Sequence, residues 1–296
     1  MLFNLRFSKF FWVIFPVGFK VLSMFRTYKS QSSAGFAWNI SLQIFHATVR
    51  SIRQKHRSPI VGLMSEMMQS AMLVFVFLIF FQVLGLRGSA LRGDFVIYIM
   101  SGIFLFMTHN KAVSAVAGAE VPTSPMMQHA PMNTAIAISS AALGSLYLQT
   151  LSMLVILLIY YVVFTPFVID DPVGAFSMFL LAWFTGCAVG LLMFAIKPWA
   201  PTFTTVLRTL YQRANMIASG KMFVANTLPS FMLAMFDWNS LFHTIDQARG
   251  FAFINYNPHN SSIIYPINVG IALMTLGLIG EYYTRKRASS SWSAKN

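Results

Sequence analysis

The chain has 296 residues, of which 56% are hydrophobic and only 10% are charged, and its formal net charge is +13. Because soluble proteins carry about 25% charged residues, this composition excludes an ordinary soluble domain and indicates an integral membrane protein. The single cysteine, Cys187, excludes an intrachain disulfide and a cysteine-ligated metal cluster.

Residues 1–35 are predicted to form an interfacial and flexible segment. Residues 10–19 are apolar, but they are broken by Pro16 and bounded by lysines, so they are too few to span a bilayer. A secretory signal peptide is the competing interpretation, but no small-x-small cleavage pattern follows at a suitable distance. We therefore expect an interfacial anchor here, followed by a short flexible joint at 30–35.

Residues 36–57 are predicted to form an amphipathic helix on the cytoplasmic membrane surface. Trp38, Phe45 and Val49 would form its apolar side. Its cations are candidates for the first contact with a lipid-linked phosphate that enters the membrane protein from the side, but binding to anionic lipid explains them equally well. These cations are Arg50, Arg53, Lys55 and Arg57.

Six stretches are predicted as transmembrane helices, because about 20 apolar residues are needed to cross about 30 Å of hydrocarbon. They cover residues 62–86, 95–117, 134–164, 175–196, 203–235 and 263–283. The fifth stretch is interrupted by Arg208, Arg213, Asn215 and Lys221. The predicted fold is an all-α membrane protein with a six-helix domain at 58–287, short outer re-entrant helices and a cytoplasmic tail at 288–296.

The distribution of charge predicts the orientation of these spans. Residues 1–57 hold nine of the 21 cations and none of the eight acids, and further cations follow the last span. Lys and Arg accumulate on the cytoplasmic side, so both termini are expected to be cytoplasmic. Nucleic-acid binding is disfavoured, because the cations border apolar spans instead of forming a soluble basic face.

No motif of an enzyme active site is present. Gly220-Lys221 lacks the upstream glycine and the following Ser or Thr of a phosphate-binding loop. The six histidines are scattered and form no zinc-ligand pair. We therefore expect neither catalysis nor a bound cofactor or metal in this chain.

A polar run at 238–249, Trp-Asn-Ser-Leu-Phe-His-Thr-Ile-Asp-Gln-Ala-Arg, stands just before the last apolar stretch. It resembles the Trp-Asn-Pro-Leu-x-His-x-x-Glu-x-x-Arg run of bacterial ABC exporter permeases of the ABC-2 type, which export capsular polysaccharide. The matching residues are Trp238, Asn239, Leu241, His243 and Arg249. Asp246 stands for Glu, and Ser240 replaces Pro.

This resemblance implies the inner-membrane subunit of an ATP-driven exporter. It implies a homodimer that moves a lipid-linked polysaccharide and works with a separate ATP-binding subunit, with periplasmic and outer-membrane export proteins as further partners. It also implies that the cytoplasmic loop at 120–133 receives the ATPase; a simple connector is the alternative. The candidate coupling residues in that loop are Pro122, Pro125, His129, Pro131 and Asn133.

The polar run has two interpretations. It is either a re-entrant pair of short outer helices that shapes the exit, or a structural cap in which His243, Asp246 and Arg249 pair at helical spacing. Arg213 and Lys221 are candidates for the substrate pathway, since cations in a span usually face a cavity or a partner. An interfacial position for Arg213 and a snorkelling Lys221 are the alternatives. Export of O-antigen or teichoic-acid-like polymers, a non-transporting scaffold and an ion-coupled transporter remain competing functions.

Overall fold

The computed structural model describes residues 33–55, 58–83, 85, 94–120 and 133–293. The described residues are α-helical, with no strand among them. The chain divides into two compact units, residues 1–42 and 43–296, and the boundary falls within α2 (Ser33–Lys55). Helix α2 corresponds to the amphipathic helix predicted at 36–57, whereas most of the predicted interfacial segment at 1–35 lies outside the described residues.

Among the described residues, five helices are long and apolar enough to cross a membrane, as expected for a helical membrane protein. They are α3 (Pro59–Val83), α4 (Phe95–Ala117), α6 (Thr134–Val163), α7 (Pro172–Ile196) and α11 (Ile264–Ser293). Asp94, Asn133 and Asp171 cap α4, α6 and α7 by accepting hydrogen bonds from backbone N–H groups of the first turn.

The stretch at 203–235 does not form the single span that its overall hydrophobicity predicts. It is divided into α8 (Pro201–Ala218), the short 3-10 helix η1 (Ala225–Thr227) and α9 (Ser230–Phe236). Gly220 has a φ of 73°, a left-handed conformation that ends a helix. The predicted number of six apolar spans is therefore not confirmed. A further helix, α10 (Ser240–Ala252), carries most of the polar run.

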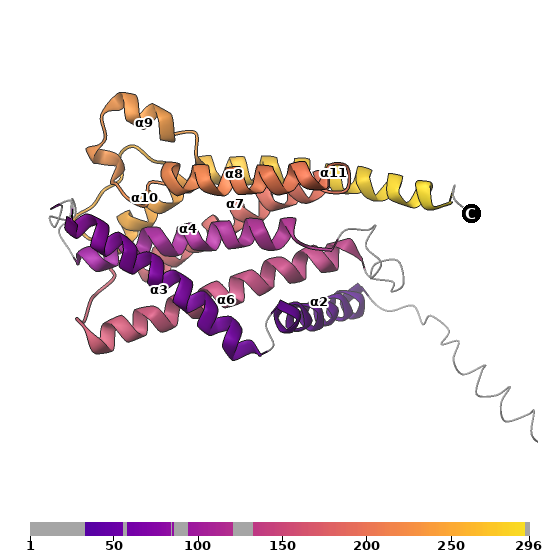
Figure 1. Ribbon diagram of the computed structural model, residues 1–296, viewed down its shortest axis with the longest axis horizontal. Helices are drawn as coiled ribbons and strands as arrows, with labels where there is room; N and C mark the ends of the chain where they lie inside the picture. Colours follow the sequence, from indigo (N-terminus) through magenta and orange to yellow (C-terminus); the bar gives the residue numbers. More distant parts are fainter. Residues whose placement is uncertain (1–32, 56–57, 84, 86–93, 121–132, 294–296) are drawn as a thin grey trace, which may run out of the picture. The chain divides into compact units, whose positions relative to one another are not determined.

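Within the unit 43–296, consecutive long helices run antiparallel (Figure 1). Lys197, just after α7, donates to the carbonyl of Ala119, just after α4, at 3.2 Å. Tyr160, near the end of α6, donates to the carboxylate of Asp94 at the start of α4, at 2.5 Å. The ends of α4 and α7 therefore lie together, and so do the start of α4 and the end of α6.

The two ends of this helical unit differ in charge. We name the end at which α4 and α7 finish the basic end, because its described charges include Lys197, Arg285 and Arg287. We name the opposite end the acidic end, because its charges include Asp94, Asp171 and Asp246. This separation follows the charge pattern of the sequence.

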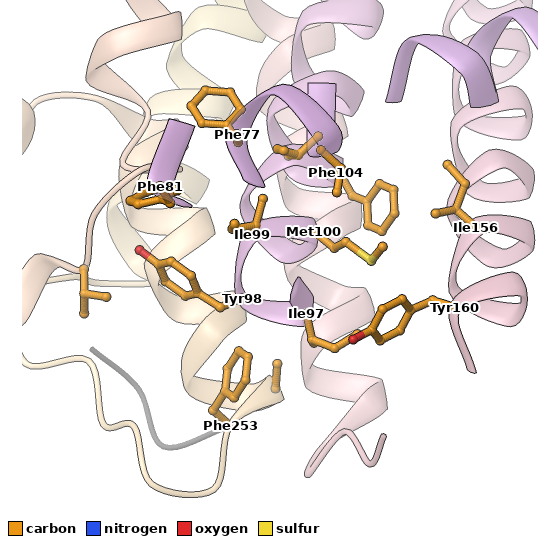
Figure 2. Packing of buried hydrophobic residues seen from close by; sticks show 14 of the residues in the cluster. Phe77, Phe81, Ile97, Tyr98, Ile99, Met100, Phe104, Ile156, Tyr160 and Phe253 are labelled. Carbon is orange, nitrogen blue, oxygen red and sulfur yellow. The ribbon is translucent and has the colours of Figure 1, made fainter. Parts of the chain in front are cut away.

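Helices α4 and α7 form the centre of the unit, and α3, α6 and α11 expose broad apolar faces. An added Cβ at Gly186 of α7 would lie 2.5 Å from the carbonyl oxygen of His109, and one at Gly190 would lie 2.9 Å from that of Val113. The two glycines thus allow the backbones of α4 and α7 to approach closely. Toward the acidic end, aromatic and aliphatic side chains of α3, α4, α6 and the end of α10 pack together (Figure 2).

Candidate functional site

Helix α8 has three different faces around its axis, one buried and two exposed. Its buried face includes Thr204, Tyr211 and Asn215, which recur at helical spacing and pack toward α4 and α7. One exposed face is apolar and contains Val206, Leu210 and Ile217. The other exposed face is polar, and we name it the α8 polar stripe. It consists of Thr202, Thr205, Thr209 and Arg213.

The α8 polar stripe is unusual for a helix of a membrane protein. Thr205 and Thr209 satisfy their hydroxyl donors on carbonyls of their own helix. Arg213, by contrast, is exposed and has no hydrogen bond or ion pair with any described residue. A charged side chain that faces outward from a membrane helix usually faces water or a partner instead of lipid.

Polar contacts attach the buried face of α8 to α4. His109 is fully buried, and its Nε2 lies 2.9 Å from the hydroxyl of Tyr211, while its Nδ1 lies 3.1 Å from the carbonyl of Ala182 on α7. One step along, Gln212 donates to the hydroxyl of Ser114 at 2.6 Å. These pairs could not be predicted from the sequence, because their members are about a hundred positions apart.

Arg208 lies near the middle of α8, seven residues after its first residue. Its charge still influences the basic end: burial first, and then the positive charge of Arg208, lower the pKa of the Lys197 ammonium. Arg213 lies more than one helical turn further along α8, away from Lys197.

Arg249 is the centre of the polar segment at 219–262. It is fully buried, and its guanidinium donates to the carbonyls of Gly220, Lys221 and Phe223 at 2.9, 2.8 and 2.7 Å. The guanidinium also lies 4.2 Å from the ring centroid of Tyr98 on α4. These carbonyls belong to the turn that follows α8, where no helix supplies backbone donors, so Arg249 satisfies them.

Asp246 holds the loops around α10. Its carboxylate accepts hydrogen bonds from the hydroxyls of Tyr256 at 2.5 Å and Ser261 at 2.7 Å, and from the backbone N–H of Ala225 at 3.4 Å. Burial first, and then the bond to Asp246, raise the pKa of the Tyr256 phenol, so it remains a donor. By accepting these hydrogen bonds, Asp246 connects α10 to the segments around Ala225, Tyr256 and Ser261.

Asn239 and Trp238 fix the start of α10. Asn239 caps the helix by accepting from the N–H of Leu241, and its amide donates to the side-chain oxygen of Asn215 on α8 at 2.9 Å. Trp238 is exposed, and its indole donates to the carbonyl of Met235. Asn239 thus connects the end of α8 to the start of α10. The indole bond of Trp238 is local, but the Trp238 carbonyl accepts a hydrogen bond from the hydroxyl of Tyr265 on α11 at 2.8 Å.

His243 also holds a loop. Its Nδ1 accepts from the N–H of Ser262 at 3.2 Å, and its Nε2 lies 2.7 Å from the carbonyl of Asp237. The helical spacing had suggested that His243 pairs with Asp246 and Asp246 with Arg249. That pairing is wrong for the described residues: each of the three side chains bonds to a loop instead, because these loops offer unpaired backbone groups.

Lys221 is buried and lies among aromatic rings, so the predicted snorkelling to the surface is not observed. Its ammonium is 3.4 Å from the ring centroid of Phe106 and 5.3 Å from that of Phe77, and no described residue forms a hydrogen bond with it. Gly102 of α4 makes room for this arrangement, since an added Cβ would lie 2.9 Å from the Arg249 Nη2 and 3.0 Å from the Lys221 Cα. Lys221 therefore faces the interior of the helical unit and not the α8 polar stripe.

The structure places only part of the predicted basic helix and docking loop. Arg50 and Arg53 are exposed on α2, and Lys55 is its last residue. Asn133 is the N-cap of α6, with its side chain 3.1 Å from the N–H of Ala135. The remaining predicted residues lie outside the described parts of the chain; these are Arg57, Pro122, Pro125, His129 and Pro131.

Comparison with protein-family models and with curated proteins gave no match for this chain. Among the described residues, no group of three or more His, Cys, Asp or Glu side chains is arranged to hold a metal ion.

Proposed function

We propose that this chain is the membrane-spanning subunit of an ATP-driven ABC exporter that moves a lipid-linked surface polysaccharide, capsular in type, across the bacterial inner membrane. The observation that carries this proposal is the α8 polar stripe. At 1.5 Å per residue, an 18-residue helix is about 27 Å long, close to the thickness of the hydrocarbon core. The stripe, from Thr202 to Arg213, follows about 17 Å of this length.

Contact with lipid would be energetically unfavourable for this stripe. An arginine at the centre of a bilayer costs about 2.5–3.5 kcal/mol on insertion scales. Arg213 lies about 7.5 Å from the end of α8, where this cost is smaller, but water or a polar partner is still a better neighbour for it than lipid. A second copy of the chain that faces the stripe would enclose a hydrophilic path between the two subunits. Hydroxyl groups and an arginine suit the passage of a hydroxyl-rich polymer that carries carboxylates or phosphates.

The connectivity supports six crossings of the membrane. Helix α8 begins after α7 at the basic end, and near its other end Asn215 bonds to Asn239 at the start of α10. If α8 crosses as the fifth segment, α3 starts and α11 finishes on the same side, and both termini are cytoplasmic by the positive-inside rule. Helices α9 and α10 would then form the outer re-entrant pair, with the bonds of Asp246 and Arg249 closing its backbone.

Energy would come from a separate ATP-binding subunit, because the sequence contains no phosphate-binding loop. The connection at 120–133 would receive this subunit on the basic side. The described flanks of this connection are well anchored: Ala119 accepts from Lys197, and Thr134 donates to Glu281 of α11 at 2.5 Å. A force applied to the connection would therefore reach α7 and α11.

A non-transporting scaffold is the main alternative, and the α8 polar stripe disfavours it, since a scaffold has no need for a hydrophilic path. Export of O-antigen or of a teichoic-acid-like polymer fits the same architecture. The deciding experiment is deletion of the gene, followed by analysis of surface polysaccharide and of polymer inside the cell. Loss of one surface polymer with its accumulation inside is expected, and the polymer that is lost identifies the cargo. Unchanged surface polymers would refute the proposal.

A further inference from the structure

A cavity of about 530 Å³ lies between α2, α3, α4 and α6 in the basic half of the unit 43–296. This volume is within the range of about 300–1,000 Å³ that ligand pockets occupy. Small side chains form much of its wall and leave the space open; they include Ala47, Ala115, Ala137, Ala141 and Gly144. Arg50 and Gly118, which also line the cavity, are exposed, so its rim reaches the surface.

An ionic cluster around the buried Glu66 forms the inner part of the cavity wall. Glu66 of α3 is 2% exposed, and its Oε2 accepts bonds from the ammonium of Lys111 on α4 at 2.7 Å and from the amide of Gln149 on α6 at 2.9 Å. The Lys111 ammonium also donates to Gln69 at 2.7 Å. These bonds use two of its three N–H groups, so one donor remains for a ligand.

Ionisable residues within membrane helices are costly, and they usually mark a functional site. Glu66 is one of only eight acidic residues in the chain, and it lies on the wall of a cavity together with its partners. A closed ion pair that served stability alone would not require an adjoining open space. The arrangement therefore indicates a site built to receive a polar ligand.

The charges that line the cavity are balanced. Arg50 and Lys111 supply two positive charges, and Glu66 and Glu120 supply two negative charges. A simple anion would meet repulsion from the carboxylates, and a simple cation would meet repulsion from the arginine and the lysine. A ligand with both signs of charge, separated by a few atoms, meets a side chain of opposite charge at each of its ends.

The depth of the cavity indicates a lipid. Ala137 is three residues from the start of α6 and Lys111 is six residues from the end of α4, which places them about 4.5 and 9 Å from these helix ends. The headgroup region of a bilayer extends about 5–8 Å beyond each side of the hydrocarbon core. The cavity therefore lies at the level where a phospholipid headgroup meets its acyl chains.

We propose that this cavity binds the headgroup of a phospholipid that carries a phosphate and a primary ammonium, as in phosphatidylethanolamine. The phosphate accepts hydrogen bonds from Lys111 and Arg50, and the ammonium donates to the carboxylates of Glu66 and Glu120. A choline headgroup has no N–H donor for the carboxylates, and a glycerol headgroup has no positive charge for them. Selectivity for a primary ammonium is thus the property that distinguishes this site from general attraction between a basic protein and anionic lipid.

The test uses the purified full-length chain, so it does not depend on an ATPase partner or on the proposed transport. The protein in detergent is titrated with phosphatidylethanolamine, phosphatidylcholine or phosphatidylglycerol of the same acyl chains, and bound lipid is counted by native mass spectrometry. Phosphatidylethanolamine is expected to bind roughly tenfold more tightly than the other two, which corresponds to about 1.4 kcal/mol. Equal binding of the three lipids, or a preference for phosphatidylglycerol, would overturn the proposal.

Matched variants locate the binding. Ala115→Leu fills the cavity without a change of charge, and Glu120→Gln removes one carboxylate at the rim. Both are expected to abolish the preference for phosphatidylethanolamine, while gel filtration shows the same monodisperse protein. Arg208→Gln is the control, because it removes one positive charge from α8, a helix that does not line this cavity. A preference that survives both cavity variants, or that is lost equally in the control, would refute the site.

Discussion

Two arginines, Arg249 and Arg213, show how differently this chain uses the same side chain. Arg249 is fully buried and donates to three carbonyls of the turn after α8. Arg213 is exposed on α8, and no described residue gives it a hydrogen bond or an ion pair. Arg249 therefore stabilises the fold of the polar segment. The donors of Arg213 are available to water or to a partner outside the described chain.

The regions around the two arginines differ in the same way. The polar segment at 219–262 directs Asp246 and His243, like Arg249, to loop groups, so its polarity is mostly satisfied internally. The α8 polar stripe directs its polarity outward. Polar residues of a membrane protein therefore divide into those that replace water for the backbone and those that face water or cargo, and only the structure separates the two kinds.

The largest effect is expected for Arg249→Met. The substitution removes the hydrogen bonds that the Arg249 guanidinium donates to three carbonyls, and it should cost about 3–5 kcal/mol, since each buried group left without its partner costs about 1–3 kcal/mol. Thermal unfolding of the purified protein in detergent measures the loss, with Arg213→Met as the matched control. Equal melting temperatures for the two variants would remove the distinction between the regions.

A smaller effect is expected for Tyr256→Phe, which removes a donor to Asp246 and should cost about 1.5–3 kcal/mol. Because the folded protein raises the pKa of this phenol above its ordinary value of 10.0, the folded state keeps the proton where the unfolded state loses it. The contribution of Tyr256 is thus complete below about pH 10 and is lost as the pH rises further. Melting curves should show a difference between wild type and variant that is constant from pH 7 to 10 and shrinks toward pH 11. A difference that grows in alkali would contradict this network.

The next effect concerns the close contact at Gly102. Gly102→Ala gains about 1 kcal/mol of helix propensity but forces a Cβ against Arg249 and the Lys221 backbone, which costs about 1–3 kcal/mol. A net loss of stability is therefore expected. Gly144→Ala is the control, since its Cβ would meet neighbours at an ordinary 3.6 Å, and it should stabilise the protein. Stabilisation by both substitutions would show that the polar segment does not pack tightly on α4.

Hydrophobic runs in the sequence were sufficient to predict five of the long helices, because each run is continuous and exceeds the length of a span. The stretch at 203–235 was predicted as a single span, because its many apolar residues do not indicate the turn at Gly220. That turn depends on the left-handed backbone conformation of Gly220 and not on hydrophobicity. The contacts of His109 with Tyr211 and of Glu66 with Lys111 were inaccessible to spacing arguments. Such pairs form only when distant helices pack, whereas the cap at Asn239 is local and follows from residue type.

The smallest effect on stability, and the sharpest test of the comparison, is expected for Arg213→Gln. An exposed side chain without a partner among the described residues should change the free energy of unfolding by no more than about 0.5 kcal/mol. Export should nevertheless fall by roughly tenfold if the α8 polar stripe contacts an acidic polymer, since loss of a charged contact of about 1.4 kcal/mol has that size. Cells that carry the variant at wild-type protein level are assayed for surface polysaccharide, with Ile217→Val on the apolar face of α8 as the control. Normal export by Arg213→Gln would leave the stripe without a role in transport, whereas reduced export together with reduced protein level would make Arg213 a structural residue like Arg249.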